Sequence, residues 1–120
     1  MNIAVIGLGK IGTSFLRNMI MQKDKGVNVL AVSEEAETPG REAAQKENIP
    51  VMSIHEIGNL ADKIDIIFDL SGNIETRKIL NSFHESQSNK HTVIVRENVV
   101  FLFWAIIEGK TVPEVVRDRN

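Results

Sequence analysis

Two kinds of hydrophobic pattern alternate along the chain. Short continuous apolar runs are typical of strands that are buried on both faces of a parallel sheet. Between them, apolar residues recur every three or four positions, as on one face of an amphipathic helix. The runs predict strands at residues 2–6, 27–32, 49–52, 64–70 and 92–95, and the spaced segments predict helices at 10–26, 39–47, 54–60, 74–85 and 99–108.

This order of elements predicts the fold class. Helices that separate consecutive strands form right-handed crossovers, which make the strands parallel and place helices on both faces of the sheet. Two helix starts support the pattern, because Thr38 precedes Pro39 as an N-cap and Ser53 forms a capping box with Glu56. We therefore expect a single α/β domain with a doubly wound parallel sheet of Rossmann type.

A glycine-rich loop connects the first strand with the first helix. Residues 7–12 are Gly-Leu-Gly-Lys-Ile-Gly, and a Gly-x-Gly-x-x-Gly string in this position is typical of a site for the pyrophosphate of a dinucleotide. Gly7 permits the turn, Gly9 lets a diphosphate approach the backbone, and Gly12 lets the helix pack close to the sheet. Lys10 and Ile11 are expected to contribute at the helix start, where free N–H groups face the phosphates. The alternatives are an inherited turn with an empty site and a solvated Lys10.

The end of the second strand bears on which nucleotide binds. Dehydrogenases that use NAD carry a carboxylate there, which accepts hydrogen bonds from the ribose and repels a 2′-phosphate. Ser33 holds that place and Glu34 follows, so Glu34 reaches the ribose if the strand ends one residue later. Ser33 with Arg41 would instead suit a 2′-phosphate, although the nearby acids oppose that charge. We expect NAD(P), with NAD favoured, and contacts from Ser33 and Glu34.

Three segments carry a resemblance to a known family. Residues 2–19, 29–33 and 64–73 resemble the N-terminal NAD(P)-binding domain of homoserine dehydrogenases and of Gfo/Idh/MocA-type oxidoreductases. The resemblance implies that Ser71, Gly72 and Asn73 lie near the ribose and nicotinamide of the cofactor. The alternative is a plain strand-to-helix turn with Asn73 as the N-cap.

The chain also departs from that family. Those enzymes carry a lysine just after the fifth strand, whereas residues 95–99 here are Val-Arg-Glu-Asn-Val. No catalytic residue is therefore predicted.

A second resemblance is to small Rossmann modules attached to PAS-containing bacterial sensor proteins, and residues 36–40 and 102–104 carry it.

Composition narrows the classes of partner. At 120 residues we expect one domain, 1–120, without a separate substrate domain. A formal charge of −2 gives no basis for nucleic-acid binding, and the apolar runs are too short for a membrane span. The absence of cysteine fits a reducing cytoplasm. His55, His84 and His91 lack the spacing of metal ligands, so no metal site is expected.

The predicted helix at 99–108 is apolar on every side, and one sheet face covers only part of such a helix. We expect a homodimer through Phe101, Phe103, Trp104 and Ile107, with burial in the core of a monomer as the alternative.

The function expected is a small dinucleotide-binding module with a regulatory role. The alternatives are an oxidoreductase cofactor domain completed by another subunit or domain, and a structural dimerisation module without a ligand.

Overall fold

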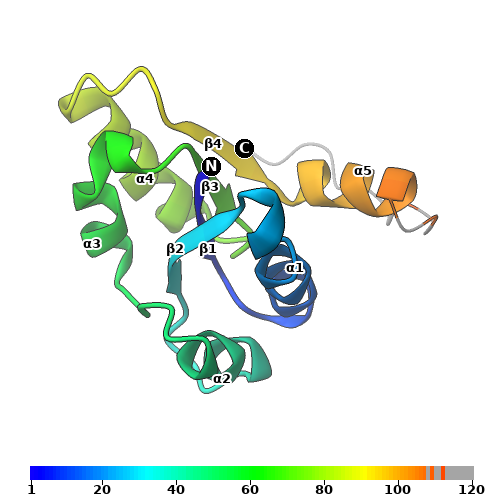
Figure 1. The fold of residues 1–120 in the computed structure, drawn as a ribbon. Helices are drawn as coiled ribbons and strands as arrows, with labels where there is room; N and C mark the ends of the chain where they lie inside the picture. The colour runs from blue at the N-terminus through cyan, green and yellow to red at the C-terminus, as the bar shows by residue number, and fades with distance from the viewer. Residues whose placement is uncertain (108, 110–111, 113–120) are drawn as a thin grey trace.

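The computed structural model describes residues 1–107, 109 and 112, and it confirms an α/β fold with one parallel sheet between two layers of helices (Figure 1). The elements in chain order are β1 (Asn2–Ile6), α1 (Lys10–Ile20), the short 3-10 helix η1 (Lys23–Lys25), β2 (Asn28–Ser33), α2 (Pro39–Lys46), α3 (Ile54–Asn59), the 3-10 helix η2 (Ala61–Lys63), β3 (Ile66–Asp69), α4 (Ile74–Ser86), β4 (Val93–Arg96) and α5 (Glu97–Ile107).

The sheet has the strand order β2-β1-β3-β4, and all of its pairings are parallel. Outside β2, Val51 forms a single parallel bridge with Val32. The predicted strand at 49–52 is therefore reduced to one bridge. Its hydrogen bonds run from Val32 N–H to the Pro50 carbonyl and from Met52 N–H to the Val32 carbonyl, and Pro50 has no N–H to extend the ladder.

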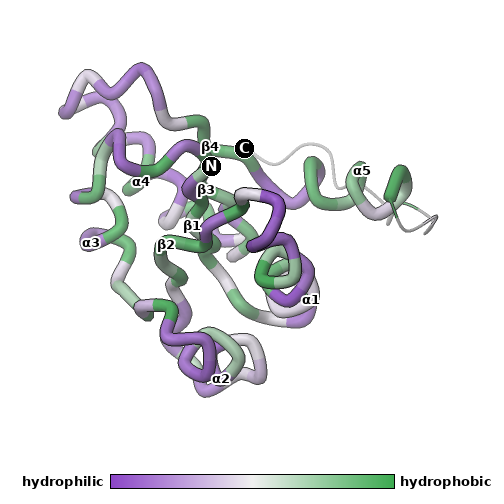
Figure 2. Tube along the Cα trace, in the orientation of Figure 1, coloured by the Kyte–Doolittle hydropathy of each residue, from purple (hydrophilic) through white to green (hydrophobic). Residues whose placement is uncertain are grey.

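Alternate residues of β1 enter two separate cores. Ile3 and Val5 face one side, where they pack with residues of α1, α2 and α5, including Phe15. Ala4 and Ile6 face the other side, where residues of α3 and α4 cover them. Figure 2 shows hydrophobic residues along the strands at the centre, with both hydrophobic and hydrophilic residues along the helices outside. The central strands are buried on both faces, as their continuous apolar sequence predicts.

The two helix starts predicted from caps agree with the structure, but two other helix limits do not. Thr38 caps α2, and Ser53 forms the predicted capping box with Glu56. The first helix ends at Ile20, not near Gly26, because the polar residues that follow form the short turn η1. The last helix begins at Glu97, two residues earlier than predicted, and Glu108 lies outside the described residues.

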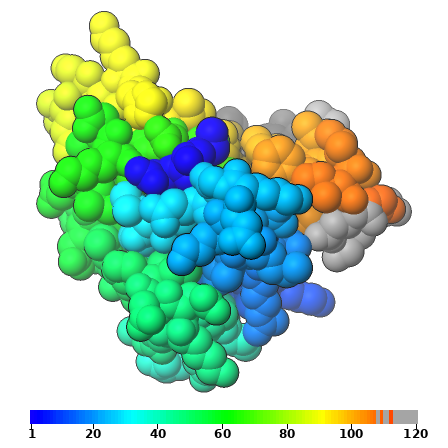
Figure 3. All heavy atoms as spheres, in the orientation of Figure 1, coloured from blue at the N-terminus to red at the C-terminus, as the bar shows by residue number. Residues whose placement is uncertain are grey.

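Helix α5 projects from the carboxyl end of β4 and lies beside α1 (Figures 1 and 3). Phe101 is only 6% exposed and packs against the ring of Trp104 at 5.9 Å between centroids. The prediction that Phe101 forms a dimer surface is therefore wrong, because the monomer already buries it. Phe103 and Trp104 are half-buried against the same core, whereas Ile107 is exposed.

No helix within the described residues is long and apolar enough to cross a membrane.

Candidate functional site

The carboxyl ends of the parallel strands meet at one edge of the sheet. Pairing places Ile6 beside Ser33 and Asp69, and Asp69 beside Arg96. Open parallel sheets bind ligands outside this edge, where the connections to the following helices begin. The candidate site is built from three such connections.

The first connection is the glycine loop, and its shape depends on two of its glycines. Gly7 has φ +88°, and a Cβ atom there would lie 2.6 Å from Ser71 N and Cα. A Cβ atom on Gly12 would lie 1.8 Å from the Gly7 carbonyl oxygen. Neither position has room for a larger residue. Because both are glycine, the loop can contact the start of α1 and the end of β3 closely.

Gly9 has a different environment. A Cβ atom there would meet no atom within 4 Å, so the second glycine of the motif is not required by packing within the described residues. Gly9 is exposed and precedes the first residue of α1. It is the place where a ligand can approach the backbone closely.

The start of α1 offers unpaired donors beside Gly9. The first helical hydrogen bond runs from Thr13 N–H to the Gly9 carbonyl, so the N–H groups of residues 10–12 precede it. No acidic side chain lies in this first turn. Lys10 is exposed, and the half-buried side chain of Ile11 packs against the core, so only its backbone can face a ligand. Free N–H groups with a helix dipole are suited to an anion.

The first turn of helix α2 packs against the glycine loop. Thr13 donates its hydroxyl to the Leu8 carbonyl at 2.9 Å. A Cβ atom on Gly40 would lie 2.3 Å from that hydroxyl and 3.0 Å from Leu8 Cβ, so the first turn of α2 contacts both residues. The glycine loop is therefore held in place before any ligand binds.

The second connection follows β2. Ser33 is the last residue of the strand, is buried, and accepts the Gly7 N–H at its carbonyl at 2.9 Å. Glu34 turns back to the glycine loop, where one carboxylate oxygen accepts the Leu8 N–H at 2.8 Å. The other oxygen accepts the Ala36 N–H at 3.1 Å. The carboxylate at the end of this strand thus comes from Glu34 although the strand ends at Ser33.

Arg41 is also part of this connection. Its Nη1 donates to the carbonyls of Glu34 and Glu35, at 3.0 Å each. Its Nε is enclosed and makes no hydrogen bond with the described residues. The guanidinium therefore binds the backbone of the loop that carries Glu34.

The third connection follows β3. Asp69 is 3% exposed, and its Oδ1 accepts the Ser71 N–H at 3.2 Å and the Ser71 hydroxyl at 2.7 Å. Gly72 has φ +66°. Asn73 accepts the Glu75 N–H at 2.8 Å and is the N-cap of α4, as in the alternative that the sequence left open. These contacts organise the turn, and the predicted role of Ser71, Gly72 and Asn73 at a ribose stays a prediction.

A cleft of about 690 Å³ lies between these connections, which is within the ordinary size range of ligand pockets. The structure brings five predicted residues to its wall: Gly7, Ser33, Glu34, Ser71 and Asn73. Sequence reasoning missed the opposite wall, which comes from the starts of α3 and α4 and consists of Ser53, Ile54, His55, Glu75, Thr76 and Ile79. The residues of α3 follow the bridge at Val51 and those of α4 follow β3, and that position in the chain is the signal that could have identified them.

The cleft has an arrangement suited to a nucleotide. Polar backbone groups lie at the glycine loop, a carboxylate lies at the end of β2, and apolar side chains such as Ile54 and Ile79 lie opposite. No group of three His, Cys, Asp or Glu side chains in the described part of the chain is close enough to hold a metal ion. These features fit a ligand with a phosphate, a ribose and a flat apolar base.

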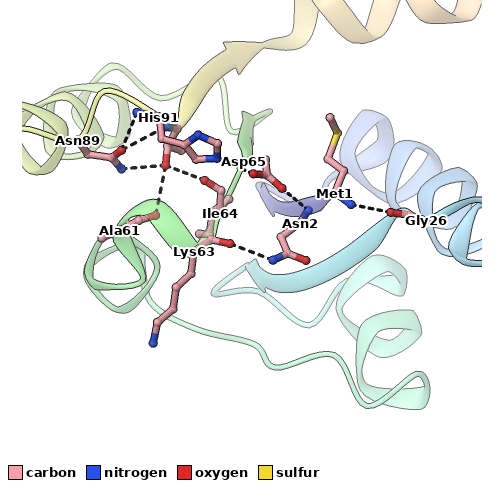
Figure 4. A network of polar contacts seen from close by, with 10 residues as sticks. Met1, Asn2, Gly26, Ala61, Lys63, Ile64, Asp65, Asn89 and His91 are labelled. Carbon is pink, nitrogen blue, oxygen red and sulfur yellow. Dashed lines mark hydrogen bonds and ion pairs between the residues drawn. The ribbon is translucent and has the colours of Figure 1, made fainter.

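A separate polar network lies at the amino ends of the strands, away from this cleft (Figure 4). Asp65 accepts the Asn2 N–H at 2.6 Å, and its other oxygen contacts His91 Nε2 at 2.6 Å. The Asn2 N–H and the His91 ring together hold the pKa of Asp65 below its usual value. The network joins β1 to the residues before β3 and β4, which gives it a structural role.

A sequence model of the Gfo/Idh/MocA group, described as an oxidoreductase family with an NAD-binding Rossmann fold, matches residues 1–94. No curated protein sequence matches the chain.

Two solved structures with a similar fold are homoserine dehydrogenase of S. aureus at pH 6.0 and at pH 6.5. Sequence identity is 16% in both comparisons, 92% of this chain is covered, and the TM-scores are 0.50 and 0.51. This chain covers 39% and 40% of those two chains, less than half of their length. At this identity the likeness concerns the fold alone.

Proposed function

This chain belongs to the oxidoreductase family with an NAD-binding Rossmann fold, and from that premise we propose that it is a small regulatory module that binds a nicotinamide dinucleotide in the cleft beside the glycine loop. The observation that carries the proposal is the pairing of open backbone donors at residues 10–12 with the Glu34 carboxylate beside Leu8. The donors suit a pyrophosphate, and the carboxylate suits a ribose.

The proposed contacts follow the predicted residues. Gly7 and Gly12 shape the loop, Gly9 leaves room for the pyrophosphate, and Lys10 and Ile11 contribute backbone N–H groups. On the other side of the cleft, the turn at residues 71–73 is proposed to lie near the nicotinamide ribose. Ser33 acts through its carbonyl, which holds Gly7, and its buried side chain is close to the wall of the cleft.

NAD is the proposed form of the cofactor. The Glu34 carboxylate accepts a hydrogen bond from the loop that is proposed to hold the pyrophosphate, so it lies close to the place of the adenosine ribose. Carboxylate oxygens accept hydrogen bonds from ribose hydroxyls and repel the charge of a 2′-phosphate. Support for NADP would come from Arg41, but its Nη1 already donates to two backbone carbonyls.

A second candidate function is an oxidoreductase cofactor domain that another domain or subunit completes. The family membership and the open cleft favour it. Against it, this chain has Arg96, Glu97 and Asn98 where the related dehydrogenases carry a lysine. We therefore favour the binding module, with residues 1–120 acting as one dinucleotide-binding domain. The cytoplasmic location stays a prediction from composition.

A homodimer through α5 is a further part of the proposal. Three apolar side chains on this helix are strongly exposed, namely Leu102 at 54%, Ile106 at 71% and Ile107 at 74%. They replace Phe101 as the proposed contacts, and Phe103 and Trp104 lie beside them. Large apolar side chains exposed together on one helix are typical of an interface.

Thermal unfolding in the presence of NAD+, NADH, NADP+ and NADPH tests the function. A ligand at about 100 times its dissociation constant adds roughly 2.7 kcal/mol, which raises Tm by several degrees in a small domain. The expected result is a shift with NAD+ or NADH that is absent in Gly9→Val, whose added side chain fills the ligand's space. No shift with any dinucleotide would contradict the proposed function and leave the structural dimerisation module.

A further inference from the structure

The guanidinium of Arg41 joins helix α2 to the loop after β2. One nitrogen, Nη1, donates to the Glu34 and Glu35 carbonyls at 3.0 Å each. It therefore binds two consecutive peptide groups of the loop. The backbone of Arg41 is fixed as well, because Thr38 Oγ1 accepts its N–H at 3.2 Å. Arg41 and both glutamates line the same cleft.

The loop that Arg41 holds carries the carboxylate that reaches the glycine loop. Glu34 accepts the Leu8 N–H at 2.8 Å with one oxygen and the Ala36 N–H at 3.1 Å with the other. The direction of this side chain depends on the conformation of its own backbone. A continuous series of hydrogen bonds therefore runs from α2 through Arg41 and Glu34 to Leu8.

We infer that Arg41 is a positioning residue that sets a preference for NAD over NADP by holding the Glu34 carboxylate at the adenosine ribose. The inference rests on the proposed function and concerns the same site. A guanidinium with free donors at this place would favour a 2′-phosphate. Here Nη1 donates to the Glu34 and Glu35 carbonyls, so this nitrogen holds the loop and is not available to a phosphate, and loss of Arg41 would release the loop and with it the carboxylate.

The two possible roles of Arg41 predict opposite results. If Arg41 positions Glu34, its removal weakens the binding of NAD+ more than that of NADP+. If Arg41 binds the 2′-phosphate directly, its removal weakens the binding of NADP+ more than that of NAD+. The ratio of the two dissociation constants distinguishes these roles, because a general loss of stability affects both cofactors alike.

Isothermal titration of the full chain with NAD+ and with NADP+ measures this ratio. The proteins are wild type, Arg41→Met, Glu34→Ala, and the double variant, with Lys46→Met as a control that removes a positive charge from the exposed end of α2. We expect the preference for NAD+ to fall about fivefold in Arg41→Met, as for one lost hydrogen bond. It is expected to be unchanged in Lys46→Met. In the Glu34→Ala background, Arg41→Met should cause no further fall, because coupled residues are not additive.

Three results would overturn the inference. They are a selective loss of NADP+ binding in Arg41→Met, an equal loss for both cofactors, and a full further fall in the Glu34→Ala background. If wild type binds neither cofactor, the proposed function itself fails and the inference fails with it. If wild type binds but Arg41→Met does not fold, Arg41→Gln replaces it, and an unchanged preference in that variant contradicts the positioning role.

Discussion

Gly12 lies directly against the carbonyl oxygen of Gly7, and a Cβ atom on Gly12 would be only 1.8 Å from that oxygen. The two ends of the glycine loop are therefore in close contact. Gly9, between them, has no atom within 4 Å of its Cβ position. The three glycines of one motif thus serve two purposes. Gly7 and Gly12 are required by the fold, whereas packing within the described residues does not require Gly9, whose proposed role is to admit the ligand.

This difference predicts opposite phenotypes for Gly12→Ala and Gly9→Val. The added methyl group of Gly12→Ala meets a backbone atom that cannot move freely, so we expect a loss of about 2–3 kcal/mol in the free energy of unfolding. Gly9→Val should leave that free energy within about 0.5 kcal/mol of wild type while NAD+ binding is lost. Urea unfolding measures the first quantity and titration the second. A strongly destabilised Gly9→Val would show that Gly9 also has a role in the fold.

Thr38→Ala removes the N-cap of α2. The Arg41 N–H then loses the hydroxyl that accepts it at 3.2 Å, and we expect a loss of about 1 kcal/mol in the free energy of unfolding. Ser82→Ala is the control, because Ser82 is exposed in the middle of α4 and should change stability by less than about 0.5 kcal/mol. Equal urea midpoints for the two variants would argue against the cap.

The lowered pKa of Asp65 predicts that the free energy of unfolding depends on pH. The Asn2 N–H and His91 lower the pKa of this carboxyl from its usual value of 3.8 in the folded state, so the ionised form stabilises the fold. That contribution is complete above pH 3.8 and is lost as pH falls through the lower folded pKa. Asp65→Asn should therefore have a lower urea midpoint than wild type at pH 7, and the difference should shrink below pH 3.8.

Asp62→Asn provides the comparison for this measurement, since Asp62 is an exposed aspartate nearby in the chain. Its midpoint should follow wild type across the same pH range. A difference between Asp65→Asn and wild type that stays constant down to the lowest pH would contradict the role of the ionised carboxylate.

The proposed dimer is tested on α5. Ile106→Glu places a charge on a side chain that is 71% exposed, so a dimer through this helix should dissociate to a monomer. The matched control is Ile74→Glu, because Ile74 is an exposed isoleucine on α4, on the opposite face of the sheet. Analytical ultracentrifugation over a range of concentrations gives the mass. A wild-type protein that remains a monomer throughout excludes the dimer.

Much of the fold could be predicted because it depends on spacing within short segments. The apolar run at 2–6 and the four-residue periodicity after Lys10 define a strand and a helix without reference to the rest of the chain. Thr38 and Ser53 marked helix starts for the same reason, since a cap binds N–H groups two or three residues away. The prediction of a strand at 49–52 was wrong, because a short apolar run does not show how many hydrogen bonds it forms with a neighbouring strand.

The sequence by itself determined the order of strands and helices, the Rossmann-type fold and the position of the glycine loop, because each depends on neighbours in the chain. Only the tertiary structure decided that Glu34 reaches Leu8, 26 residues away, and that Arg41 holds the loop that carries Glu34. It also decided that Phe101 is buried while Ile106 is exposed. These outcomes depend on how distant segments pack, and an apolar or charged residue has the same local pattern whether it faces a core, a ligand or solvent.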